Sequence, residues 1–503
     1  MSLKQRFGKS TLWMSAAASG NSLISLVIFI ILSRLLAPEE IGLVAFALIV
    51  VELGKILVNA GLPQAIVRHP DWDEDYAATC FYLNLGLATL VTAAVFFIAA
   101  PAIAHYYDAR AELLVQVLSI VFVLEGAKAV HEGKLKRDFN FRAIALRTVV
   151  ASLMAGVVGV WLAVKGYGVW ALVWQQLINQ ILITLITWKS AHWLPRLQFS
   201  LAHARSLLRF STPLTLAQVI SNFASKIYEM LVGLLLGPAA LGFFRVGGRA
   251  LFILQDIVIK PFEQTLLPAL ARLDERDARA QATLRVMRMS AYFTFPVFFG
   301  AAALGPEFIE LAFTAKWTQS GQVMTLLALG IAPLVIGYQV NAALTASGHS
   351  QRVMLLASIT FVLNCLLGFL LVPYGILAAA AGFALRTYLS IFFNMWFFKQ
   401  VFGIGILHQL RTVAPTFCAA IMMLAVVLAA KHYALPYLLQ GDGAMHLATK
   451  LILLAGLGGL VYALIMSCIF RQETKHFLGE SAALAPAKAQ PVIQYLQRLL
   501  RLA

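Results

Sequence analysis

The chain has 503 residues, of which 60% are hydrophobic and only 12% are charged, whereas soluble domains carry about 25% charged residues. This composition excludes an ordinary soluble protein. The formal net charge of +16 would suggest nucleic acid as the partner of a soluble protein, but in so apolar a chain it indicates loops that face the cytoplasm and anionic lipid. We therefore expect membrane lipids, and no nucleic acid, among its partners.

Apolar runs of about 20 residues, the length that crosses the hydrocarbon core as a helix, recur along the whole chain. Lipid offers the backbone no hydrogen-bond partner, and the alternating pattern of a barrel is absent. The sequence therefore predicts an all-α polytopic membrane protein with about fourteen transmembrane helices. We expect them near residues 11–33, 43–60, 77–100, 112–130, 144–164, 169–188, 211–236, 243–264, 289–304, 320–340, 353–372, 376–398, 413–430 and 448–469.

The distribution of basic residues predicts the orientation of these helices. With a cytoplasmic N-terminus, the inside segments hold 25 of the 39 Lys and Arg residues, and nine more lie within or at the ends of spans. The outside loops hold the remaining five, and cytoplasmic loops are the ones enriched in Lys and Arg. We therefore expect both termini in the cytoplasm. The five outside residues are Arg34, Arg110, Lys165, Lys316 and Lys431.

Short segments of the first half recur in the second half. LLAPEEIGL at 35–43 is matched by LLGPAALGF at 235–243, and GYGVWAL at 166–172 is echoed by PYGILAA at 373–379. Because the offsets stay nearly constant, we predict two six-helix lobes related by a parallel pseudo-twofold repeat, with a cavity between them. The expected parts are the lobes 1–200 and 201–400, two extra helices within 401–470, and a cytoplasmic tail 471–503 with a short amphipathic helix.

Ionisable residues follow one face of the second helix of each predicted lobe. At 100° per residue, Arg245, Arg249 and Asp256 lie within about 60° of one another, and so do Glu52 and Lys55. A charge that faces lipid costs about 2.5–3.5 kcal/mol, so these faces must contact protein or water. They predict a hydrophilic cavity, although snorkelling to the membrane surface and purely structural ion pairs stay open as alternatives.

Four further segments carry a resemblance to a known family. They are SRLLAPEEIGL, LLGPAALGFFRV, LLPALARLDERD and ELAFTAKWTQSGQVMTLLALG. With them the chain resembles the polysaccharide transporter family, the Wzx-type flippases of O-antigen, colanic acid and exopolysaccharide units, within the multidrug/oligosaccharidyl-lipid/polysaccharide flippase superfamily. The resemblance covers nearly the whole chain, but its patterns are degenerate.

The resemblance implies a transporter of the bacterial inner membrane. Its cargo would be an undecaprenyl-diphosphate-linked oligosaccharide, which two lobes in alternating access flip from the cytoplasmic to the periplasmic leaflet for surface polysaccharide or lipopolysaccharide biosynthesis. A polysaccharide polymerase and a chain-length regulator are expected as partners, and no cofactor is expected. Span 1 lacks a deep cation, because Arg34 lies at its outer end.

Candidate residues for this cargo follow from its chemistry. A diphosphate is best held by Arg and Lys, and buried carboxylates can carry a coupling ion. Hydroxyl-rich sugars need amide partners and aromatic faces, although Trp near a membrane boundary is more often an anchor. The candidates are Arg249, Arg245, Lys55 and Lys226 for the diphosphate, Glu52, Glu229 and Asp256 for ion coupling, and Trp174, Gln175 and Asn179 for sugar contact.

Two other classes of function stay open. A drug/cation antiporter of the same superfamily should favour carboxylates over a cationic face. A membrane-embedded glycosyltransferase or polymerase should carry a large outside loop with catalytic acids, and the longest predicted outside loop has about 16 residues. No HExxH pair or P-loop is present, and the four cysteines are isolated, so we expect neither a metal site nor an enzyme.

Overall fold

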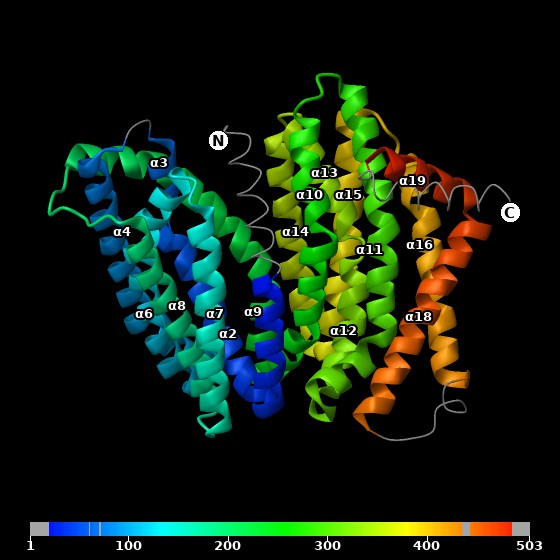
Figure 1. The fold of residues 1–503 in the computed structure, drawn as a ribbon, viewed down its shortest axis with the longest axis horizontal. Coiled ribbons are helices and arrows are strands. Elements are labelled where there is room, and N and C mark those ends of the chain that lie inside the picture. The colour runs from blue at the N-terminus through cyan, green and yellow to red at the C-terminus, as the bar shows by residue number, and fades with distance from the viewer. Residues whose placement is uncertain (1–19, 60, 70–71, 435–442, 485–503) are drawn as a thin grey trace. The chain divides into compact units, whose positions relative to one another are not determined.

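The structure is a computed structural model that describes residues 20–59, 61–69, 72–434 and 443–484. The first part of the predicted span 11–33 and the amphipathic helix expected near the end of the tail lie outside these residues. In the described residues every regular element is a helix (Figure 1). The predicted class, an all-α polytopic membrane protein, is confirmed by twelve helices that are long and apolar enough to cross a membrane.

The chain divides into two compact units, Met1–Val246 and Gly247–Ala503. The helices that begin in the first unit are an apolar helix Gly20–Leu35, α2 (Pro38–Asn59), α3 (Leu62–Arg68), α4 (Glu74–Ala94), the π-helix η1 (Val95–Ala99), α5 (Ala100–Tyr106), α6 (Ala109–Arg137), α7 (Phe141–Val164), α8 (Val169–Ala191) and α9 (Leu201–Val258).

The second unit contains the end of α9 and the helices that follow it. These are α10 (Lys260–Leu270), α11 (Arg276–Phe313), η2 (Ala315–Trp317), α12 (Thr318–Ile331), α13 (Leu334–Ala346), α14 (Ser350–Leu371), η3 (Val372–Tyr374), α15 (Ile376–Phe402), α16 (Ile406–Ala429), η4 (Ala430–Ala434), α18 (Ala444–Cys468) and α19 (Arg471–Leu484). The helix α19 lies within the predicted cytoplasmic tail.

The number of spans depends on how α9 and the first helix are counted. One candidate span, Ser225–Leu270, covers the last part of the seventh predicted helix and all of the eighth, and Gly20–Leu35 is shorter than the others. Within α9 the backbone leaves helical geometry at Gly237, which has φ 84° and ψ −179°, a conformation that glycine adopts without steric cost. Division at Gly237 and inclusion of Gly20–Leu35 would give fourteen, and that number stays a prediction.

The two copies of the repeated segment contact each other inside the first unit. A Cβ placed on Gly42 would lie 1.7 Å from the Pro238 carbonyl oxygen, and one on Gly242 would lie 2.0 Å from the Pro38 carbonyl oxygen. Each Cα is thus no more than about 3.5 Å from the opposite carbonyl oxygen, the range of a Cα–H···O contact. This reciprocity is what a local twofold axis produces. The first unit ends at Val246, and the predicted lobe boundary at residue 200 stays a prediction.

A second glycine brings α2 close to α6. A Cβ on Gly54 would lie 2.3 Å from the Phe122 ring, and Phe122 is fully buried in the core of the first unit. Only a residue without a side chain permits this approach. Because Lys55 follows Gly54 and Glu125 follows Phe122 by one helical turn, the same approach brings these two charged residues together.

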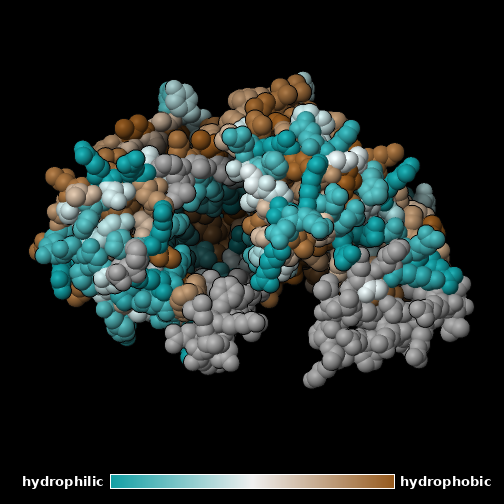
Figure 2. All heavy atoms as spheres, turned by 90° about the horizontal axis from the view of Figure 1, so that it is seen from above, coloured by the Kyte–Doolittle hydropathy of each residue, from teal (hydrophilic) through white to brown (hydrophobic). Residues whose placement is uncertain are grey.

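Hydrophilic side chains gather at one end of the helices in each unit. Figure 2 looks onto this end, where α3 lies in the first unit and α19 in the second. Exposed basic residues of the described part include Arg142 and Arg205 in the first unit, and Arg276 and Arg285 in the second. All four belong to segments predicted as cytoplasmic, and this orientation stays a prediction.

Candidate functional site

A chain of ion pairs follows one face of α6 through the first unit. Lys128 lies 2.9 Å from Glu125 and 3.4 Å from Glu132, and Lys136 lies 2.8 Å from Glu132. The spacing of three and four residues places all four side chains on one face. At about 1.5 Å per residue, the row extends roughly 16 Å along the helix.

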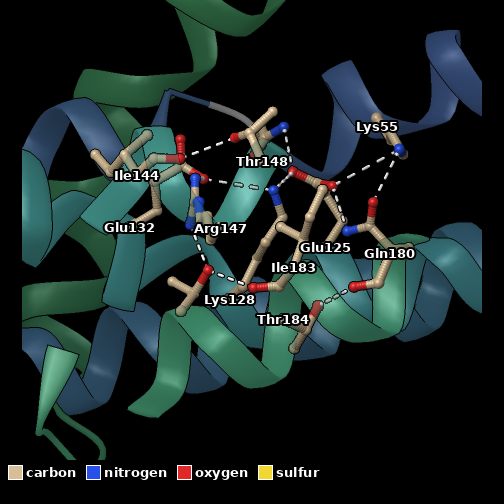
Figure 3. A network of polar contacts seen from close by, with 12 residues as sticks. Lys55, Glu125, Lys128, Glu132, Ile144, Arg147, Thr148, Gln180, Ile183 and Thr184 are labelled. Carbon is tan, nitrogen blue, oxygen red and sulfur yellow. Dashed lines mark hydrogen bonds and ion pairs between the residues drawn. The ribbon is translucent and has the colours of Figure 1, made fainter. Parts of the chain in front are cut away.

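Neighbouring helices complete this chain of charges (Figure 3). Arg147 of α7 donates to Glu132 at 2.7 Å and to the Thr187 hydroxyl of α8. Gln180 of α8 donates to Glu125 at 2.9 Å, and Asn59 of α2 donates to the same carboxylate at 3.2 Å. We name Lys55, Glu125, Lys128, Glu132, Lys136 and Arg147 the charge ladder.

Lys55 lies beside Glu125, at the end of the charge ladder opposite Lys136, and is held differently from the other cations. Its Nζ donates to the neutral Gln180 Oε1 at 3.1 Å, and Glu125 Oε2 is 4.0 Å away. At 4.0 Å the Lys55–Glu125 pair is an ion pair without a hydrogen bond. The Lys55 side chain is 24% exposed, whereas Glu125 is buried. Of these two residues, Lys55 is therefore the one that another molecule can reach.

The charge ladder carries more positive than negative charge. Its four cations face two carboxylates, which leaves an excess of two positive charges. Two of the four cations are open to solvent, since the Lys55 and Lys136 side chains are 24% and 43% exposed. An excess of this sign and size favours an anionic ligand over a cationic one.

Two predicted cations of the first unit pair directly with predicted carboxylates. Lys226 lies 2.8 Å from Glu52, and Arg245 lies 3.1 Å from Glu229. Arg245 also donates to the Ala45 carbonyl at 3.4 Å. The first pair joins α2 to α9, and the second lies within α9 across the kink at Gly237. These cations would have to leave a carboxylate before they could hold a ligand.

The other predicted charges lie in the second unit. Asp256 and Lys260 form an ion pair of 2.6 Å, both half-exposed. Gln255 donates to the Tyr338 hydroxyl of α13 at 2.7 Å. Arg249 is half-buried near the start of this unit. It therefore belongs to a different unit from Arg245, Lys55 and Lys226.

The predicted sugar-contact residues occupy three settings on α8. Trp174 is exposed. Gln175 packs against α7, since a Cβ on Gly159 would lie 2.9 Å from the Gln175 Cβ. Asn179 precedes Gln180, and its Oδ1 is buried without a hydrogen bond from the described residues. Asn179 is thus the one whose polar atom is buried without a partner in the described residues.

Sequence reasoning missed Glu125, Lys128, Glu132 and Arg147. Glu125 and Lys128 lie inside the predicted span 112–130, and Arg147 lies inside 144–164, but their partners could not be read from the sequence. Glu132 lies beyond the predicted span, whereas α6 continues to Arg137. Hydropathy ends a span where the residues become polar, but backbone hydrogen bonds continue the helix beyond that point.

The described residues contain no group of three or more His, Cys, Asp or Glu residues arranged to hold a metal ion. The four cysteines are free, and Cys80 is buried. The charge ladder is therefore the main concentration of buried ionisable groups that the described part of the first unit offers to a ligand.

Comparison with known proteins places this architecture in a family. Residues 31–322 match the family described as "Polysaccharide biosynthesis protein". The succinoglycan biosynthesis transport protein ExoT of Rhizobium meliloti (strain 1021) is 26% identical over 63% of this chain, a match that spans 64% of its own length. The lipopolysaccharide biosynthesis protein WzxC of Escherichia coli (strain K12) is 22% identical, over 76% of this chain and 78% of its own.

The fold also matches a solved transporter. The lipid II flippase MurJ, in its inward closed conformation, superimposes with a TM-score of 0.75 over 92% of this chain and 99% of its own, at 13% identity. At this identity the likeness concerns the fold alone. The family match covers more than half of the chain, and the predicted resemblance to polysaccharide transporters is confirmed. This chain is a member of the polysaccharide biosynthesis protein family.

Proposed function

We propose that this protein is a flippase that moves a lipid-linked oligosaccharide from the cytoplasmic to the periplasmic leaflet of a bacterial inner membrane by alternating access. Membership in the polysaccharide biosynthesis family supports this, as do a relative named as a biosynthesis transport protein and a fold shared with a lipid II flippase. In this proposal the protein is a transporter and not an enzyme, and both of its termini lie in the cytoplasm. A polymerase and a chain-length regulator would act on the flipped product.

The observation that carries the proposal is the excess of two positive charges in the charge ladder, with Lys55 as its accessible end. A diphosphate linker carries about two negative charges at neutral pH, and ammonium groups bind phosphate as point charges. We propose Lys55 as the first contact of the linker. Arg249, Arg245 and Lys226 are proposed as further contacts.

The carboxylates and the sugar-contact residues keep the roles predicted for them. Glu52, Glu229 and Asp256 are proposed to couple transport to an ion gradient, since each is held by one cation that a diphosphate could draw away. Trp174, Gln175 and Asn179 of α8 are proposed to face the sugars. The drug/cation antiporter is the less supported alternative, because a cationic cargo would meet like charge at Lys55.

The test replaces Lys55 and follows glycan export in cells that lack the natural gene. Lys55→Gln removes the charge but keeps a hydrogen-bonding side chain, and should reduce export about ten- to hundredfold, as expected for the loss of a charge-assisted contact of roughly 1.5–3 kcal/mol. Lys55→Arg keeps the charge and should retain most export. The lipid-linked precursor should accumulate in the cytoplasmic leaflet of the Lys55→Gln strain. Full export by Lys55→Gln at normal protein abundance would remove Lys55 from the substrate path.

A further inference from the structure

Four donors surround the buried carboxylate of Glu125, and Lys55 is the most distant of them. Lys128 Nζ, Gln180 Nε2 and Asn59 Nδ2 approach the carboxylate to 2.9, 2.9 and 3.2 Å, whereas Lys55 Nζ stays at 4.0 Å. A buried carboxylate needs compensation by charge and hydrogen bonds. Lys128 and the two amides supply this compensation without Lys55.

Gln180 holds both partners through opposite ends of one amide group. Its Oε1 accepts from Lys55 at 3.1 Å, while its Nε2 donates to Glu125 at 2.9 Å. The amide therefore orients Lys55 beside the carboxylate and keeps the two charges from direct contact. Gln180 is buried, so its side-chain amide is held by these two partners and by the packing around it.

We propose that Glu125, Lys128 and Gln180 are positioning residues that keep Lys55 as a releasable cation for the phosphate groups of the substrate. When Lys55 moves to bind an anion, Glu125 keeps its contacts with Lys128 and with the Gln180 and Asn59 amides. The buried carboxylate is therefore never left without a partner. Lys226 lacks this arrangement, since it is hydrogen-bonded directly to Glu52 at 2.8 Å. This inference rests on the proposed function, and it adds which residues set the affinity of Lys55 for an anion.

The inference makes a prediction about a residue that does not itself contact the substrate. In Lys128→Gln, Glu125 loses its closest cation, and Lys55 should move into direct contact with it. Lys55 would then form a direct ion pair with Glu125, and its affinity for another anion should fall about ten- to hundredfold. The double change Glu125→Gln with Lys128→Gln removes the buried carboxylate as well, so the affinity of Lys55 should return towards the original value.

The measurement uses the purified full-length protein and inorganic pyrophosphate as the probe. Lys55 is modified with an amine-reactive reagent, and protection by pyrophosphate is followed by mass spectrometry. We expect millimolar pyrophosphate to protect Lys55, the Lys128→Gln protein to need a ten- to hundredfold higher concentration, and the double variant to need a concentration near the original one. Lys226 is as exposed as Lys55, 25% against 24%, but it is proposed to contact a phosphate only after it has left Glu52. It should be protected only after Glu52→Gln, and the exposed Lys165 should never be protected.

The outcomes separate this inference from a structural role and from the proposed function. If Lys128→Gln lowers protein abundance but leaves unchanged the pyrophosphate concentration that protects Lys55, the charge ladder is structural and the inference is wrong. Absence of protection at Lys55 in the natural protein overturns it as well. Export by the Lys55→Gln strain is a separate test. If pyrophosphate protects Lys55 but Lys55→Gln exports normally, Lys55 binds an anion as inferred but lies outside the substrate path.

Discussion

Replacing Gly42 with alanine should separate α2 from α9 where the two copies of the repeated segment meet. The new Cβ would lie 1.7 Å from the Pro238 carbonyl oxygen and 2.5 Å from its carbon, while ordinary contact begins at 3.4 Å. The backbones must therefore move apart by roughly 1.5 Å, because a carbonyl within a helix cannot rotate away. Overpacking of this kind costs about 1–3 kcal/mol, and the higher helix propensity of alanine offsets up to about 1 kcal/mol of it.

With the full offset the net cost is at most about 2 kcal/mol, and it should appear in the conformational equilibrium. It applies only to a conformation in which the two helices touch, so the equilibrium should shift by up to about 30-fold towards a conformation in which they are apart. We expect glycan export to fall while protein abundance stays normal. Gly242→Ala should have the same effect through the Pro38 carbonyl, and the double variant should cost less than the sum, because the first change already makes room for the second.

Two assays test this reasoning. Export and abundance are measured in cells, and an Ala45→Cys reporter is labelled with a membrane-impermeant maleimide in a background without the four natural cysteines. Ala45 is buried one turn beyond Gly42, so its labelling should rise in Gly42→Ala. Gly86→Ala on α4 is the matched control, since a Cβ there meets nothing within 4 Å. If Gly42→Ala and Gly86→Ala export and label alike, the close contact of the repeated segments has no part in transport.

Two further predictions follow from the charges. The ion pair between α2 and α9 can be exchanged by combining Glu52→Lys with Lys226→Glu. If the pair only joins the helices, the double variant should restore the abundance and export that either single change lowers. Restored abundance without export would assign Lys226 or Glu52 to the cargo or the coupling ion. In a cysteine-free background, Lys316→Cys should react with an impermeant maleimide from the periplasm and Arg205→Cys only after permeabilisation, and the reverse pattern would overturn the proposed orientation.

The class of the fold could be predicted from the sequence because the bilayer imposes a simple requirement. An apolar run of about 20 residues must become a helix in lipid, and the predicted spans 144–164 and 169–188 accordingly correspond to Phe141–Val164 and Val169–Ala191. Ends beyond the hydrocarbon were predicted less well. The span expected at 289–304 belongs to Arg276–Phe313, since helices that extend into the headgroup region carry charged residues that hydropathy does not count.

The repeated segments show how far a sequence pattern reaches. Pro38 and Gly42 match Pro238 and Gly242 at an offset of 200 residues, and this match indicated a repeat. The close approach of the two copies was not visible in it, because a glycine in a helix has several possible reasons. Only the tertiary structure placed each glycine against the carbonyl of the opposite proline.

The ionisable residues divide in the same way. The period of the helix placed Glu52, Lys55 and Arg245 on polar faces, since a charge that faces lipid is costly. The sequence by itself determined that these residues must meet protein or water. It could not determine their partners, because Glu125 and Gln180 lie 70 and 125 residues away from Lys55 and reach it only through the packing of α2, α6 and α8. That packing decided that Lys226 and Arg245 pair directly with a carboxylate, whereas Lys55 donates to the neutral Gln180.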